Sequence, residues 1–172
     1  MAEDKNLDLF KEVKEVESEK KTLGRKLRVG FIGTGGIAHS HMKGYGIFDD
    51  VEVVAGADII PGKARAFLDE FGLSDAKDYE DYKKMIAECN LDAVSICTYN
   101  RQHAVPAIYA LEHGLNVLLE KPFTVTLDQA VEVCKAEKKS GKLLSIGYQT
   151  RYAAKSRFMK AECEKGTIGH IY

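Results

Sequence analysis

The sequence lacks any long apolar run, which excludes a membrane-spanning helix from the expected structure. Such a helix needs about 20 consecutive apolar residues, and no stretch of this 172-residue chain approaches that length. Residues 1–21, MAEDKNLDLFKEVKEVESEKK, carry too much charge for a secretory signal peptide. We therefore expect a soluble, cytoplasmic protein with no membrane partner.

Neither sign of charge is in excess. The chain has 25 Lys and Arg against 26 Asp and Glu, a formal net charge of −1. Nucleic acids and anionic membrane surfaces attract strongly basic chains, so we expect no nucleic-acid partner. There is also no internal repeat or low-complexity linker.

Cysteine is scarce and scattered. Structural zinc sites use closely spaced cysteine pairs, and this chain has no C-x-x-C pair. We therefore expect no metal site and reduced, mostly buried thiols at Cys89, Cys97, Cys134 and Cys163. The histidines at 39, 41, 113 and 170 also lack metal-ligand spacing, and we expect them to be solvated or hydrogen-bonded.

Glycine, by contrast, is concentrated in residues 28–38, which read RVGFIGTGGIA. An apolar run typical of a buried parallel strand leads into Gly33-x-Gly35-x-x-Ala38, a match to the G-x-G-x-x-G/A dinucleotide fingerprint. The N–H groups at the start of the following helix would face an anion. The predicted cofactor contacts are Gly33, Thr34, Gly35, Gly36 and Ile37. A plain glycine-rich connection is the alternative.

Short apolar runs alternate with helical patterns from residue 27 onward. Expected strands lie near 28–32, 51–57, 76–78, 93–97, 116–119 and 143–148, and expected helices near 36–48, 61–71, 79–89, 102–113, 127–140 and 153–165. Strict alternation implies right-handed crossovers and a parallel sheet. The expected fold class is α/β, a three-layer Rossmann-type doubly wound parallel sheet with helices on both faces.

The expected domains are a charged N-terminal extension at 1–26 and a dinucleotide-binding Rossmann domain at 27–150, with a further helix and strand at 151–172. Leu9, Val13 and Val16 fall at helical spacing among Lys and Glu. An amphipathic helix and a solvated extension are both compatible with that pattern.

Asp58 ends the second expected strand, 25 positions after Gly33. A carboxylate there accepts hydrogen bonds from the adenosine ribose hydroxyls and repels a 2′-phosphate, so NAD is favoured over NADP. Lys63 and Arg65 follow closely and could reach a phosphate, which keeps NADP possible.

Two further groups of polar residues follow later strands, at the sheet edge where ligands bind. Thr98, Tyr99 and Asn100 form a turn, with His103 in the first turn of the next helix. These residues either contact the cofactor ribose or serve only as turn and cap residues.

The other group is Glu120, Lys121 and Pro122, directly after the apolar run NVLL. Lys121 would stand where the nicotinamide ring lies, in contact with the cofactor, and could act as a proton donor or polarise a hydroxyl. An ion-paired loop lysine is the alternative. Pro122 could hold a cis bond.

Together these motifs resemble the Gfo/Idh/MocA oxidoreductase family. The resemblance covers residues 27–172 through VGFIGTGGIA, Asp58, TYNRQH at 98–103, GLNVLLEKPFTVT at 114–126 and IGYQTRY at 146–152. It implies hydride transfer between NAD or NADP and a sugar or polyol hydroxyl-bearing carbon, with Lys121 as catalytic residue and Glu120 near the ring. Thr98, Asn100 and His103 then match the family's T-P-N-x-x-H loop, with Tyr99 in place of proline, and Gln149 lies near the nicotinamide ribose.

The same resemblance implies a second α/β domain, absent from this chain, that forms the substrate pocket and mediates homo-oligomerisation. We therefore expect a cofactor-binding half that binds without turnover. Two alternatives are a non-catalytic dinucleotide-binding regulatory module and an NAD-dependent glycosidase.

Overall fold

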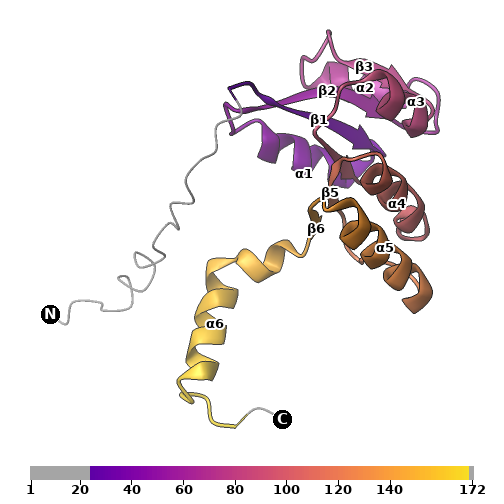
Figure 1. Ribbon diagram of the computed structural model, residues 1–172. Coiled ribbons are helices and arrows are strands. Elements are labelled where there is room, and N and C mark those ends of the chain that lie inside the picture. Colours follow the sequence, from indigo (N-terminus) through magenta and orange to yellow (C-terminus); the bar gives the residue numbers. More distant parts are fainter. Residues whose placement is uncertain (1–23, 171–172) are drawn as a thin grey trace, which may run out of the picture. The chain divides into compact units, whose positions relative to one another are not determined.

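The computed structural model describes residues 24–170 (Figure 1). These residues divide into two compact units, 24–147 and 148–170, and each is described by itself. The amphipathic helix expected near Leu9, Val13 and Val16 lies outside the described residues. The domain limits expected at 26 and 150 stay predictions.

Six parallel strands form one sheet in the first unit. Their spatial order is β3-β2-β1-β4-β5-β6, so successive strands are added on one side of β1 up to β3 and on its other side from β4 onward. That order is the dinucleotide-binding arrangement with its crevice at the switch point, and it confirms the expected fold class. The strands are β1 (Leu27–Ile32), β2 (Val51–Ala57), β3 (Lys77–Tyr79), β4 (Ala93–Ile96), β5 (Asn116–Leu119) and β6 (Leu144–Ile146).

Helices cover both faces of this sheet because each contributes an apolar stripe. One core cluster joins β1 to α1 (Gly36–Tyr45) and α2 (Lys63–Glu70). The other core cluster joins the sheet to α3 (Tyr82–Glu88), α4 (Ala104–Glu112) and α5 (Leu127–Ser140) (Figure 1). A short 3-10 helix, η2 (Asn100–Gln102), precedes α4.

Several helices start later than expected, and the starts of α2 and α3 show why. Pro61 lies in a turn and α2 begins at Lys63, because Gly62 adopts the left-handed conformation (φ 74°) and so cannot continue a right-handed helix from Pro61. Tyr79 is not helical either, since it pairs with Ala57 in β3. The next helix begins after Asp81, whose side chain accepts a hydrogen bond from the Lys83 N–H.

The second unit is mainly helical. It contains the 3-10 helix η3 (Gln149–Tyr152) and α6 (Ala154–Glu164). The strand expected after α6 is wrong for residues 168–170, which lie in a turn and coil. Gly166 and Gly169 there have positive φ angles of 74° and 77°, which break an extended strand. Residues 171 and 172 lie outside the described range.

Among residues 24–170, no helix is long and apolar enough to cross a membrane. All four cysteines are free, as expected. The expectation that they are mostly buried holds for Cys89 and Cys97 only, since Cys134 is exposed and Cys163 is half-buried.

Candidate cofactor-binding site

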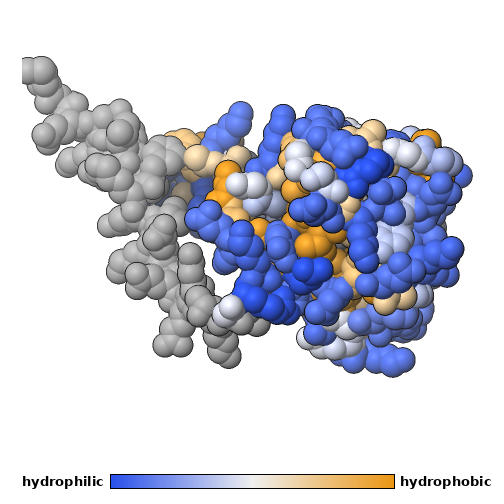
Figure 2. All heavy atoms as spheres, turned by 90° about the horizontal axis from the view of Figure 1, so that it is seen from above, coloured by the Kyte–Doolittle hydropathy of each residue, from blue (hydrophilic) through white to orange (hydrophobic). Residues whose placement is uncertain are grey.

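A cleft of about 430 Å³ opens at the carboxyl ends of β1, β2 and β4. It begins at the switch point between β1 and β4, where open α/β sheets bind their ligands. Figure 2 shows hydrophobic patches set among hydrophilic residues on one face of the protein. The apolar side chains exposed at the cleft are Ile59, Ile60, Tyr99 and Val105. Such an apolar wall suits a planar base.

The glycine turn forms one side of the cleft. Gly33 has φ 85°, and a Cβ there would lie 2.9 Å from backbone atoms of Cys97 and Thr98. Only glycine therefore allows the turn to pack this closely against the end of β4. Gly35 is the N-cap of α1 and has no side chain that could accept hydrogen bonds from the first N–H groups of the helix. A Cβ at Gly35 or Gly36 would meet open space. The open helix N-terminus fits a dinucleotide pyrophosphate.

Ile37 lines the same cleft, whereas Thr34 is buried beneath it. The Thr34 backbone N–H and hydroxyl both donate to Asp58 Oδ2, at 2.9 and 3.0 Å. The side chain of Thr34 therefore orients Asp58, and a direct contact between Thr34 and the cofactor stays a prediction.

Asp58 sits at the end of β2 with 8% of its surface exposed. Burial acts to raise the pKa of this carboxyl, but hydrogen bonds from the Thr34 N–H, Lys63 and the Ile60 N–H outweigh burial, so the pKa is lowered. Asp58 is therefore a carboxylate at neutral pH, as an acceptor for ribose hydroxyls must be.

The two cations near Asp58 have different surroundings. Lys63 Nζ lies 3.0 Å from Asp58 Oδ2 and lines the cleft. Arg65 instead donates to the backbone carbonyls of Leu73 and Ala76 and pairs with Asp69. Of these two cations, Lys63 is thus the one placed to meet a 2′-phosphate.

The loop after β4 supplies the opposite wall. Thr98 and Tyr99 line the cleft, while Asn100 is exposed as the first residue of η2. Cys97 also lines the cleft, and burial raises the pKa of its thiol to about 12, so this thiol is unreactive.

His103 is 1% exposed and does not line the cleft. Its Nδ1 lies 2.7 Å from the Pro122 carbonyl oxygen, and its Nε2 lies 3.2 Å from the Thr98 carbonyl oxygen. The shorter contact assigns Nδ1–H as a donor. His103 thereby links the loop after β4 to the loop after β5, and its contact with the cofactor stays a prediction.

The loop after β5 holds Glu120 and Lys121. Glu120 is buried, and its Oε2 accepts a 3.0 Å hydrogen bond from the Lys121 backbone N–H. Lys121 itself is exposed, and among the described residues its Nζ has no ion-pair or hydrogen-bond partner. The Lys121–Pro122 peptide bond is cis, as the sequence suggested.

His41 is the residue of this region that sequence reasoning missed. Its Nε2 lies 2.8 Å from Glu120 Oε1, and its Nδ1 lies 2.7 Å from Ser95 Oγ. A signal was available, because Ala38, His41, Met42 and Tyr45 share one face of α1 at helical spacing. A histidine in a buried stripe needs polar partners.

Gln149, expected near the nicotinamide ribose, lies in η3 of the second unit. Its place in the site stays a prediction.

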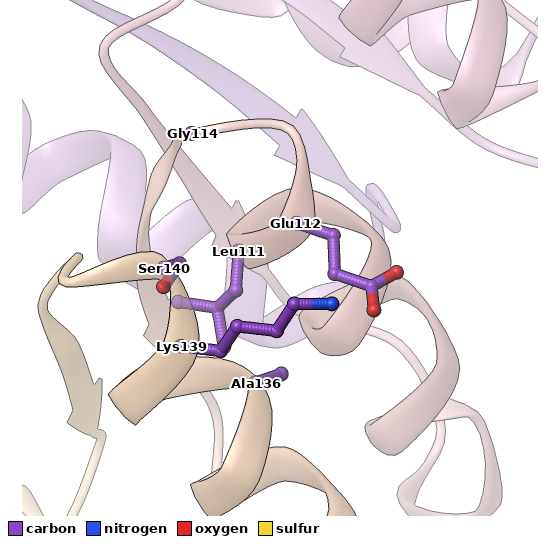
Figure 3. A pocket seen from close by; sticks show the side chains of 6 residues that line it. All are labelled: Leu111, Glu112, Gly114, Ala136, Lys139 and Ser140. Carbon is purple, nitrogen blue, oxygen red and sulfur yellow. The ribbon is translucent and has the colours of Figure 1, made fainter.

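A second hollow, of about 220 Å³, lies between the C-terminal ends of α4 and α5 (Figure 3). These helix ends precede β5 and β6, so this hollow is at the amino edge of the sheet, away from the cleft. Its lining residues are Leu111, Glu112, Gly114, Ala136, Lys139 and Ser140. In the part of the chain that the structure describes, no group of three or more metal-ligating side chains occurs.

The chain is similar to dehydrogenases in both sequence and structure. It is 34% identical over 147 residues to D-glucoside 3-dehydrogenase from Escherichia coli, covering 85% of this chain and 41% of that protein. Inositol 2-dehydrogenase from Salmonella paratyphi B is 37% identical over 145 residues, with 83% and 43% covered. The chain thus spans less than half the length of these relatives.

Solved structures of dehydrogenases are also similar to this chain. The WlbA dehydrogenase from Bordetella pertussis, in complex with NADH and UDP-GlcNAcA, superposes with a TM-score of 0.79 at 29% identity, covering 86% of this chain and 45% of that one. Myo-inositol 2-dehydrogenase from Lactobacillus plantarum gives a TM-score of 0.77 at 29% identity, with 86% and 43% covered.

A family profile matches residues 27–148, which include the glycine turn, Asp58 and the Lys121 loop. Its description is an oxidoreductase family with an NAD-binding Rossmann fold. This chain therefore belongs to the Gfo/Idh/MocA oxidoreductase family and contains its NAD-binding Rossmann domain.

Proposed function

We propose that this chain is the cofactor-binding part of a dehydrogenase that transfers a hydride between NAD and the hydroxyl-bearing carbon of a sugar or polyol. The observation that carries the proposal is the exposed Lys121, placed directly after β5 on a backbone that Glu120 holds. The relatives that act on inositol and on a D-glucoside support this substrate class.

The roles of the chain's residues follow from their positions. The glycine turn binds the pyrophosphate, Asp58 binds the adenosine ribose, and Thr98, Tyr99 and Asn100 flank the rest of the cofactor. Bound nicotinamide supplies the hydride acceptor. In the direction of carbonyl reduction, the Lys121 ammonium donates a proton to the substrate oxygen as the carbonyl carbon takes up the hydride. In the direction of alcohol oxidation, the neutral Lys121 amine takes the hydroxyl proton as the carbinol carbon gives up its hydride.

Selectivity between NAD and NADP follows from the Asp58 carboxylate. We expect tighter NAD than NADP binding, because Asp58 accepts from ribose hydroxyls and repels a 2′-phosphate. Asp58→Ala should lose this preference and leave Lys63 free to favour NADP. Isothermal titration of the purified chain with each dinucleotide measures both affinities.

Asp75→Ala is the matched control, since Asp75 is exposed and does not line the cleft. Failure of the wild-type chain to bind either dinucleotide would refute the assignment of the cleft.

The chain alone should bind without turnover, because a substrate pocket and further acid–base groups are needed for catalysis. The test follows NADH formation at a range of sugars and polyols for the chain and for Lys121→Ala. Lys121-dependent turnover by the chain alone would contradict the idea that it holds only half of the site. Lys142→Ala, on a lysine before β6, is the control.

Two further features belong to this proposal. Homo-oligomerisation of the parent protein would run through a second domain, as the family resemblance implies. A cytoplasmic location is supported by four unpaired cysteines.

A further inference from the structure

We propose that His41 is a positioning residue for Lys121, acting through Glu120. The proposal rests on the proposed function only in that Lys121 serves the nicotinamide half of the site. It gives α1 a second role, because the helix that receives the pyrophosphate at its N-terminus also sets the position of the reactive lysine.

Glu120 is the connecting residue because its two carboxylate oxygens have separate partners. Oε1 lies 2.8 Å from His41 Nε2, and Oε2 accepts from the Lys121 backbone N–H at 3.0 Å. A carboxylate only accepts hydrogen bonds, so Nε2 carries the proton in this contact. The chain of contacts therefore runs from α1 to the backbone of Lys121 without a gap.

Burial makes this connection stiff. The side chains of His41 and Glu120 are 11% and 6% exposed, so little water competes for their hydrogen bonds. A buried carboxylate that loses its partner carries a large desolvation cost. The other ring nitrogen of His41 is held at 2.7 Å by Ser95, which is fully buried in β4.

The surroundings leave Glu120 little room for another conformation. A Cβ added at Gly147 would lie 2.9 Å from Glu120 Oε1, so the backbone after β6 closes over the carboxylate. One residue further along the loop, the Pro122 carbonyl oxygen lies 2.7 Å from His103 Nδ1. Lys121 thus projects from a loop that is fixed on both sides, and Glu120 with His41 forms one of the two attachments.

Two substitutions separate a positioning role from a purely structural one. In His41→Gln the amide nitrogen can replace Nε2 and still donate to Glu120. In His41→Asn the shorter side chain can replace only Nδ1, toward Ser95. Both variants lose one contact of the ring, but only the Asn variant releases Glu120.

The readout compares the affinity of the whole chain for NAD with its affinity for ADP-ribose, which lacks the nicotinamide. For His41→Asn we expect NAD affinity to fall about fivefold, the effect of losing one hydrogen bond from Lys121 to the nicotinamide half of the cofactor, while ADP-ribose affinity is unchanged. His41→Gln should keep the wild-type ratio of the two affinities. His113→Gln, on an exposed histidine at the end of α4, should change neither.

Three outcomes would overturn the proposal. In His41→Asn they are an equal loss of affinity for NAD and ADP-ribose, or unchanged affinity for both. The third is an equal loss of NAD affinity in His41→Asn and His41→Gln. A second readout needs no ligand: the Lys121 amide, followed by NMR hydrogen exchange, should lose protection in the Asn variant and keep it in the Gln variant. Should the wild-type chain bind neither ligand, the proposed function fails, and the amide exchange still decides whether His41 holds Lys121.

Discussion

At the residue scale, several side chains of the site hold other side chains in position through hydrogen bonds and ion pairs. Thr34 uses both its backbone N–H and its hydroxyl on Asp58, and Lys63 takes a further position on the same carboxylate. A carboxylate has about four acceptor positions, and the Ile60 N–H uses one on the other oxygen. Three of these donors share Oδ2 and only the Ile60 N–H uses Oδ1, so a ribose hydroxyl would bind at Oδ1 or displace Lys63.

The glycines at 33 and 35 give a prediction that separates folding from binding. Gly33→Ala should lower the free energy of unfolding by about 2 kcal/mol or more, because it combines a positive φ with a 2.9 Å approach to backbone. Gly35→Ala should cost about 1 kcal/mol or less, since its Cβ meets open space and its φ is −81°. Urea unfolding measures both values.

NAD binding should be sensitive to Gly35 even though folding is not. The added Cβ at Gly35 stands where the pyrophosphate approaches the helix N-terminus, so Gly35→Ala should lose NAD affinity while remaining folded. Unimpaired NAD binding by the folded Gly35→Ala protein would contradict the placement of the phosphates.

At the element scale, Asp92 ties β1 to β4 at the amino edge of the sheet. It accepts hydrogen bonds from the Arg25 guanidinium at 2.6 Å and from the Arg28 backbone N–H at 2.8 Å. These two strands carry the switch point at their other ends. The Asp92 contacts thus support the site from the opposite edge without touching it.

This arrangement predicts a stability change in acid. The Arg25 hydrogen bond, against the opposing effect of burial, lowers the pKa of Asp92 from 3.8 to about 2. A carboxyl whose folded-state pKa is depressed stabilises the fold above its unfolded pKa, and that stability is lost as pH falls from about 4 to about 2. Because Arg25 is half exposed, we expect about 1 to 2 kcal/mol.

The measurement is urea unfolding of wild type and Asp92→Asn between pH 2 and pH 6. The difference in free energy of unfolding between wild type and Asp92→Asn should shrink as the pH falls from about 4 to about 2. Asp75→Asn provides a control with an exposed carboxyl. If the difference in free energy of unfolding does not depend on pH, the negative charge of Asp92 does not contribute to stability.

At the scale of the whole molecule, the described chain has one unit that contains the cleft and another that contains Gln149. All cleft-lining residues fall between Ile32 and Pro106. We therefore propose that the first unit binds the adenosine half of the cofactor, and that Gln149 contacts the nicotinamide half.

Gln149→Ala in the whole chain tests this division. NAD affinity should fall about fivefold if the side chain makes one hydrogen bond to the nicotinamide ribose. Affinity for ADP, which lacks both the nicotinamide and its ribose, should not change, because the adenosine half is assigned to the first unit. Calorimetric titration with each ligand measures the two affinities. Equal NAD affinity in variant and wild type would mean that Gln149 does not contact the cofactor.

Local patterns were enough to predict most of this fold and the positions of its glycine turn, Asp58 and the Lys121 loop. The reason is that parallel strands in such a sheet are buried on both faces, so they read as continuous apolar runs whose carboxyl ends must share one edge. Residues 116–119 and 127–140 match β5 and α5 at both ends, since an apolar run and a terminal glycine mark them clearly.

The tertiary structure decided the rest, because those features depend on groups distant in the chain. Nothing local tells that His41 meets Glu120, 79 residues away, or that His103 holds the Pro122 carbonyl oxygen rather than lining the cleft. Nor does spacing show that Lys63 turns to Asp58 while Arg65 turns away. Sequence alone determined which edge of the sheet holds the chemistry; packing determined which side chains reach it and which hold the others in place.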